Sequence, residues 1–124
     1  MLTGRLVAAG LSGELFSLEC HEPVAQAIRV MSEHDFSQIS VTHDKRLVGS
    51  LNEAHLYQEL VRDPGIKSHP VESIMEPAFP FVDVSTPVDL LATMITSHNP
   101  AVLVRDFKTE KTFIITRSDL IRVL

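Results

Sequence analysis

The amino-acid sequence repeats one pattern twice, and this repeat limits the possible folds more than any other feature of the chain. Pro23 and Pro87 are 64 residues apart, and each precedes a run with helical spacing of apolar residues. Asp44 and Asp106, in the polar turn of each copy, are 62 residues apart. The two copies therefore differ in length only around their turns, as expected for a true internal repeat.

Each copy is predicted to form a strand, a helix, two strands and a closing helix. Val24, Ala27, Ile28 and Met31 follow the i, i+3, i+4, i+7 spacing of a helix with one inward face. Short β-branched runs bounded by polar turns predict the strands. The predicted elements cover residues 15–20, 23–35, 39–41, 47–51 and 52–61 in the first copy and residues 79–84, 85–95, 101–104, 113–116 and 116–124 in the second.

The predicted fold class is α/β (α+β), with two β-α-β-β-α repeats. Each repeat is too small to bury its own core well, so the two are expected to pack on each other through their sheets. We divide the chain into a lead-in segment at residues 1–14, a first repeat at 15–66 and a second at 67–124. The lead-in is expected to contain a short helix near residues 6–9 and a turn at 10–13.

Composition narrows the class of protein. Hydrophobic residues make up 44% of the 124-residue chain, which is enough for a core. The formal net charge is −5 and no basic stripe is present, so nucleic acid is not expected as a partner. No apolar run approaches the ~20 residues of a membrane span, and a signal peptide is not expected. Cys20, the single cysteine, is expected to be a buried structural thiol in a cytoplasmic protein.

The sequence contains no recognisable enzyme motif, so we predict no catalytic residue. The six histidines lack metal-ligand spacing such as HExxH, and neither a G-x-S-x-G elbow nor a P-loop is present. All four lysines lie in predicted polar turns, which is not typical of a Schiff-base lysine for pyridoxal phosphate. We therefore expect no metal ligand and no covalent cofactor.

The junction between the last strand and the last helix contains Thr116 and Asp119. This Thr-x-x-Asp spacing is typical of a capping box, in which the two residues satisfy backbone groups at the helix start. The same geometry also suits a ligand, because a helix start offers N–H groups to an anion and a carboxylate accepts hydrogen bonds from ribose hydroxyls. Both interpretations remain open at this point.

Five motifs in a fixed order give the chain a resemblance to a tandem pair of CBS domains, the module named after cystathionine β-synthase. They are FSQISV at 36–41, LVGSL at 47–51, MEP at 75–77, NPAVLV at 99–104 and IITRSDL at 114–120. The likeness covers about residues 11–124. The runs at 10–12, 36–38 and 99–102 are most similar to the C-terminal regulatory region of cystathionine β-synthase-like enzymes.

The resemblance implies a pseudo-twofold module that binds an adenosyl ligand in a cleft shared by the repeats. AMP, ADP, ATP and S-adenosylmethionine are the ligands implied. On the family pattern, Asp119 binds the ribose and Thr116 reaches a phosphate or polar tail. The adenine is then expected beside the first strand and the end of the first helix, against Leu15, Phe16, Phe36, Ser37, Gln38 and Ile114.

The second cleft of the pair is expected to be degenerate. The positions 64 residues before Thr116 and Asp119 are Asn52 and His55, and a histidine cannot replace a ribose carboxylate. Phe113 occupies a position where the family often has glycine, so its ring is expected to reshape part of the cleft. We consequently predict one adenosyl ligand per chain.

The resemblance also implies a homodimer and a separate catalytic partner. The two closing helices carry more apolar residues than one core needs, namely Leu56, Tyr57, Leu60 and Val61 in the first and Leu120, Ile121, Val123 and Leu124 in the second. The regulated partner is expected to be a pyridoxal phosphate-dependent catalytic domain that is not in this chain. The alternative function is a ligand-free dimerisation module.

Overall fold

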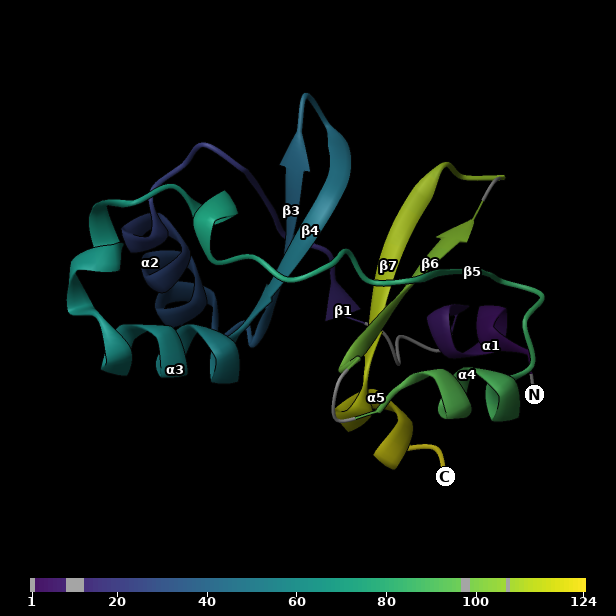
Figure 1. Cartoon of the computed structure of the whole chain (residues 1–124). Helices are drawn as coiled ribbons and strands as arrows, with labels where there is room; N and C mark the ends of the chain where they lie inside the picture. The colour runs from purple at the N-terminus through teal and green to yellow at the C-terminus, as the bar shows by residue number, and fades with distance from the viewer. Residues whose placement is uncertain (1, 9–12, 97–98, 107) are drawn as a thin grey trace. The chain divides into compact units, whose positions relative to one another are not determined.

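The computed structural model describes residues 2–8, 13–96, 99–106 and 108–124. The chain forms two compact units (Figure 1). The inner unit is Phe16–Ala78, and the terminal unit combines Met1–Leu15 with Phe79–Leu124. These spatial units do not test the predicted sequence boundaries of the repeats, which remain a prediction.

The inner unit contains the first β-α-β-β-α repeat, as predicted. Its sheet has the order β2-β3-β4, with β2 parallel to β3 and β3 antiparallel to β4. Asp44 and Lys45 have positive φ values, as the central residues of a tight hairpin require. The elements are β2 (Ser17–Glu19), α2 (Val24–His34), β3 (Gln38–His43), β4 (Arg46–Asn52), α3 (Glu53–Arg62) and the 3₁₀ helices η1 (Pro64–Ser68) and η2 (Val71–Ser73).

The terminal unit contains the second repeat and the lead-in segment. Its sheet has the order β1-β7-β6-β5, with β5 parallel to β6 and β7 antiparallel to both β6 and β1. The elements are α1 (Thr3–Ala8), β1 (Gly13–Glu14), β5 (Phe81–Asp83), α4 (Val88–Met94), β6 (Ala101–Asp106), β7 (Lys111–Thr116) and α5 (Arg117–Ile121). The predicted turn at residues 10–12 lies outside the described residues.

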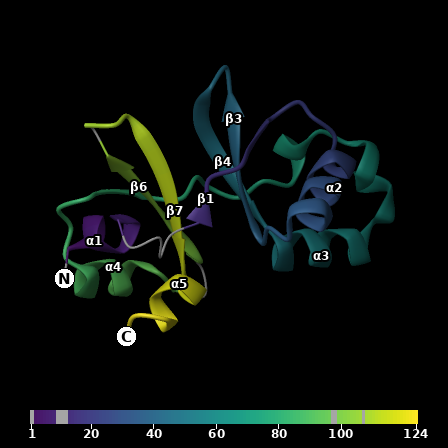
Figure 2. The ribbon, with the colours of Figure 1, turned by 180° about the vertical axis from the view of Figure 1, so that it is seen from behind.

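The lead-in segment is held by backbone hydrogen bonds to the start of the second repeat. The N–H of Thr3 donates to the carbonyl of Thr86 at 2.7 Å, and that of Gly4 donates to Val84 at 2.7 Å. Figures 1 and 2 accordingly show α1 beside α4 in both views. The lead-in therefore belongs structurally with the second repeat, although it precedes the first in sequence.

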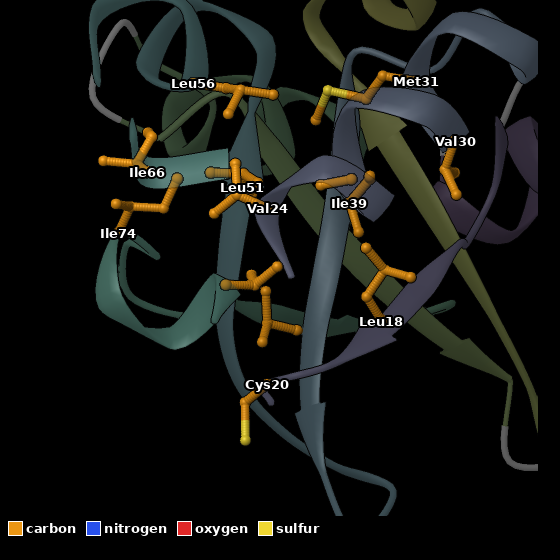
Figure 3. Close-up of a cluster of buried hydrophobic side chains, with 13 residues drawn as sticks. Leu18, Cys20, Val24, Val30, Met31, Ile39, Leu51, Leu56, Ile66 and Ile74 are labelled. Carbon is orange, nitrogen blue, oxygen red and sulfur yellow. The ribbon is translucent and has the colours of Figure 1, made fainter. Parts of the chain in front are cut away.

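Each unit has its own hydrophobic core between its sheet and its helices. In the inner unit, Leu18 from β2, Val24 from α2 and Leu51 from β4 converge with residues of α3 and the 3₁₀ helices (Figure 3). In the terminal unit, Leu91 from α4, Val102 and Ile115 are fully buried together. No helix among the described residues is long and apolar enough to cross a membrane.

Candidate functional site

Asp119 is nearly buried at the start of α5, with 7% of the residue exposed. Its Oδ2 accepts hydrogen bonds from the backbone N–H of Thr116 at 2.8 Å and from the Thr116 hydroxyl at 3.2 Å. Oδ1 lies 3.9 Å from Nη1 of Arg122, which is mostly exposed, so this ion pair contributes little. The predicted capping interaction of Asp119 is thus confirmed. Of the two carboxylate oxygens, Oδ1 has the weaker contact, which is the one with Arg122.

Ile114 and Thr116 lie on the same face of β7, because alternate residues of a strand point the same way. Ile114 is buried and pairs with Leu103 of β6. The adjacent β1 pairs Gly13 with Ile114, which brings the chain leading to Leu15 alongside. Leu15, Ile114, Thr116 and Asp119 therefore all belong to the terminal unit.

Phe113 packs against the hydrophobic core that contains Leu91 and Ile115. Its ring therefore contacts the face of the sheet opposite Ile114 and Thr116, since neighbouring strand residues alternate between faces. The expectation that this ring reshapes the ligand-binding side does not fit its packing. The comparison of Phe113 with the glycine common in the family showed that its side chain is larger. It did not show which face of the sheet that side chain lies on.

Two aromatic rings among the predicted adenine-binding residues of the inner unit cluster with a third ring, His34, which the sequence interpretation missed. Phe16 and Phe36 have ring centroids 5.7 Å apart. The ring of His34 stacks on both, at 5.9 Å from Phe16 and 5.5 Å from Phe36. His34 is exposed whereas both phenylalanines are partly buried. The only sequence signal for His34 was its place two residues before Phe36 at the helix end.

Gln38 and Ser40 lie on the same face of β3, and each has a buried side-chain oxygen with no hydrogen-bond partner among the described residues. Ser40 is 1% exposed. Buried oxygens normally have a partner, so Gln38 Oε1 and Ser40 Oγ can accept a hydrogen bond from a water or a ligand. Ser37 is exposed, and its carbonyl accepts the N–H of Glu53 at 3.0 Å.

Asn52 and His55, the residues of the predicted degenerate cleft, are engaged by the chain itself. Asn52 Oδ1 caps α3 by accepting the N–H of His55 at 2.8 Å, and Asn52 Nδ2 donates to Glu76 Oε1 at 2.8 Å. His55 Nε2 lies 2.8 Å from the carbonyl oxygen of Ile74. A carbonyl only accepts, so Nε2 carries a proton in this contact.

A pocket of about 310 Å³ opens in the terminal unit at the edge strand β5. Its described lining residues are Phe81, Val82, Asp83 and Arg105, which include none of the predicted ligand-binding residues. The hydroxyl of Ser85 donates to Asp83 and holds the pKa of that carboxyl below its usual range. The sequence predicted only a strand at β5, because no pattern of residue spacing indicates a pocket at the edge of a strand.

Cys20 is a buried thiol, as predicted, and burial raises its pKa. Its Sγ lies 3.4 Å from Nδ1 of His43. A raised pKa disfavours the thiolate, which is the nucleophilic form, so this pair does not form an activated nucleophile. Among the described residues, no group of three or more His, Cys, Asp or Glu side chains is arranged to hold a metal ion.

The sequence model of the CBS domain matches residues 11–62 of this chain. A putative signal-transduction protein with CBS domains from Burkholderia ambifaria superposes with a TM-score of 0.83, at 20% identity over 98% of this chain and 92% of that chain. This chain has the CBS-pair fold, and its first repeat is a CBS domain. The predicted tandem arrangement is confirmed.

Two further solved structures are similar in fold to this chain. A CBS domain pair in complex with 5-methylthioadenosine and S-adenosyl-L-methionine has a TM-score of 0.76 and 18% identity, over 99% of this chain and 98% of that chain. An uncharacterized conserved protein from Pyrococcus horikoshii has a TM-score of 0.69 and 27% identity, over 87% and 83% of the two chains. No curated protein sequence matched the chain. The similarity to cystathionine β-synthase-like enzymes stays a prediction.

Proposed function

We propose that this CBS pair is a non-catalytic regulatory module that binds an adenosyl ligand in a cleft between its two repeats. The observation that carries the proposal is the nearly buried carboxylate of Asp119 beside the Thr116 hydroxyl at the start of α5. A carboxylate in this setting can accept hydrogen bonds from a pair of ribose hydroxyls. The CBS pair solved with S-adenosyl-L-methionine and 5-methylthioadenosine supports the ligand class.

The two groups of predicted binding residues supply complementary chemistry. The terminal unit offers Thr116, Asp119 and the apolar Ile114, while the inner unit offers the ring pair of Phe16 and Phe36. A purine base needs flat apolar contact with a few polar groups at its edge. Gln38, with an unpartnered buried oxygen, can accept from an exocyclic amine, and Ser37 adds an exposed hydroxyl.

S-adenosylmethionine is the first candidate ligand, and AMP, ADP or ATP is the second. A thermal-shift screen of these four compounds with S-adenosylhomocysteine tests the proposal. A ligand that binds only the folded state adds ~2.7 kcal/mol of stability at a hundredfold excess over its Kd. We expect at least one of the compounds to raise the Tm, with glutamate and inorganic phosphate as inactive controls. If all five leave the Tm unchanged at millimolar concentration, the alternative of a ligand-free dimerisation module is favoured.

The ligand is proposed to control a partner enzyme in the cytoplasm. The motifs most similar to cystathionine β-synthase-like enzymes suggest a pyridoxal phosphate-dependent catalytic domain as that partner. An adenosyl signal fits such a role, because a metabolite bound by a separate module can report on the supply of methyl groups or energy. Neither nucleic acid nor a membrane has a part in this proposal.

We expect the protein to be a homodimer that pairs the closing helices of each repeat. Tyr57 and Val61 of α3 are 68% and 67% exposed, and Ile121 and Leu124 at α5 are 72% and 78% exposed. Large apolar side chains in such patches are typical of an interface, and a twofold dimer is the commonest oligomer. Light scattering at micromolar concentration should give twice the mass of 13.8 kDa. A monomer mass there would contradict the dimer, and Tyr57→Glu should shift the mass towards the monomer.

A further inference from the structure

The pocket of the terminal unit lies at β5, the end strand of the sheet order β1-β7-β6-β5. Phe81 and Asp83 are alternate residues of β5, so their side chains share one face of the sheet. Arg105 is the register partner of Asp83 on the parallel strand β6, and paired residues lie on the same face. One face of the pocket therefore combines an aromatic ring, a carboxylate and a guanidinium.

The Asp83 carboxylate is held in place by the turn that follows β5. Its Oδ2 accepts the backbone N–H of Ser85 at 3.4 Å and also the Ser85 hydroxyl. The hydroxyl contact keeps the pKa of Asp83 below its usual range, so this partly buried group is an anion at neutral pH. Each carboxylate oxygen accepts more than one hydrogen bond, so Asp83 retains acceptor capacity for a ligand.

Phe81 and Arg105 supply the other two kinds of contact. The Phe81 ring is 47% exposed at the pocket, whereas the neighbouring Val82 packs against the hydrophobic core. Ligand pockets combine such apolar surface with a few polar groups that fix orientation. The guanidinium of the exposed Arg105 carries several N–H donors in a planar fork, more than one partner takes up, and this fork suits a carboxylate.

We propose that this pocket binds a small zwitterionic amino acid with an apolar side chain. The ammonium group donates to Asp83, the carboxylate accepts from Arg105, and the side chain covers the Phe81 ring. Neighbouring strands are ~4.8 Å apart, and one carbon joins the two charged groups of an α-amino acid, so both partners are within reach. The inference goes beyond the proposed function, because it places a different ligand within the terminal unit.

The charges and the size of the pocket favour this ligand class over others. A simple anion would be repelled by Asp83 and a simple cation by Arg105, whereas a zwitterion is attracted by both. The volume of about 310 Å³ is at the lower end of the ~300–1,000 Å³ of small-molecule sites, which suits an amino acid. Glutamate should bind poorly, because its side-chain carboxylate would lie against the Phe81 ring.

An NMR titration of the full chain with L-leucine, L-methionine and L-phenylalanine tests the proposal. At least one should give saturable shifts of the backbone amides of β5 and β6. The tightest binder is then compared with its amide, which lacks the carboxylate, and with its N-acetyl form, which lacks the ammonium. Each derivative should bind about ten- to a hundredfold more weakly, because each loses a charge-assisted contact.

Two variants remove the charged contacts one at a time. Asp83→Asn keeps an oxygen that can accept the N–H of Ser85, and Arg105→Gln shortens an exposed side chain. Each should bind the amino acid at least about tenfold more weakly than the parent does. Asp89→Asn and Arg117→Gln are the matched controls, because they remove the same charges from exposed positions of α4 and α5. Both controls should bind as the parent does.

The proposal is overturned if none of the three amino acids binds at millimolar concentration. It is also overturned if the derivatives, or Asp83→Asn and Arg105→Gln, bind as tightly as the amino acid and the parent. Equal weakening in the controls would indicate an effect of net charge and would overturn it as well. Should Asp83→Asn not fold, Arg105→Gln decides alone. The titrations contain no adenosyl compound, so their failure is distinct from a failure of the proposed function.

Discussion

Replacing Asp119 with alanine is expected to weaken binding of the adenosyl ligand by about ten- to a hundredfold while leaving the CBS pair folded. The nearly buried carboxylate is the proposed acceptor for the ribose hydroxyls, and a charge-assisted hydrogen bond is roughly twice as strong as a neutral one. Its loss should cost on the order of 1.5–3 kcal/mol, or about one to two decades of affinity. The stability cost is that of a lost cap, ~1 kcal/mol. Calorimetry and urea unfolding measure the two effects separately.

Asp119→Asn is the sharper variant, because asparagine keeps the shape of the side chain and one oxygen for the N–H of Thr116. It should unfold close to the parent and still bind at least tenfold more weakly. Ser118→Ala, at an exposed neighbouring position of α5, is the matched control and should bind normally. If Asp119→Asn bound as tightly as the parent, Asp119 would be a helix cap alone.

Gly49→Ala should destabilise the protein by about 1–3 kcal/mol. The added Cβ would lie 2.5 Å from Sδ of Met75 and 2.9 Å from the carbonyl oxygen of Glu76. The methionine can shift, whereas the carbonyl belongs to a backbone that pairs with Ser50 in both directions. The strain therefore falls on the backbone around Met75 and Glu76. The loss of stability should lower the urea midpoint and leave the m-value unchanged.

Hydrogen exchange locates the effect of Gly49→Ala. The amides of Ser50 and Glu76 donate to each other's carbonyl groups, so both should exchange faster in the variant. Ser32→Ala, at an exposed helical position of α2, is the control and should change stability by less than about 0.5 kcal/mol. If Gly49→Ala kept the stability of the parent and the exchange rates of both amides, Met75 and Glu76 would not be in close contact with Gly49.

The repeat and its element order were predictable because they depend on local chemistry. Helical spacing identified α2, and the polar run around Asp44 and Lys45 marked the hairpin that their positive φ values form. The capping role of Asp119 also followed from its spacing to Thr116. Each of these features lies within a few residues along the chain, where sequence patterns carry most information.

The features missed by the sequence interpretation depend on residues far apart in the chain. The hydrogen bond from Asn52 to Glu76 joins residues 24 positions apart, whereas the sequence interpretation placed Asn52 only in the predicted degenerate cleft. The sequence interpretation assigned the lead-in segment no partner, whereas the Thr3 hydroxyl donates to the carbonyl of Thr86 across 83 residues. The unpartnered oxygens of Gln38 and Ser40 reflect burial, which a one-dimensional pattern does not give for polar side chains.

The most direct test of the central proposal is a crystal structure of this CBS pair grown with the compound that gives the largest thermal shift. We expect one adenosyl ligand per chain, with its ribose hydroxyls within hydrogen-bond distance of the Asp119 carboxylate and its base near Phe16 and Phe36. A structure with the ligand only beside His55, or with equally occupied sites at both positions, would contradict the assignment of the cleft to Asp119.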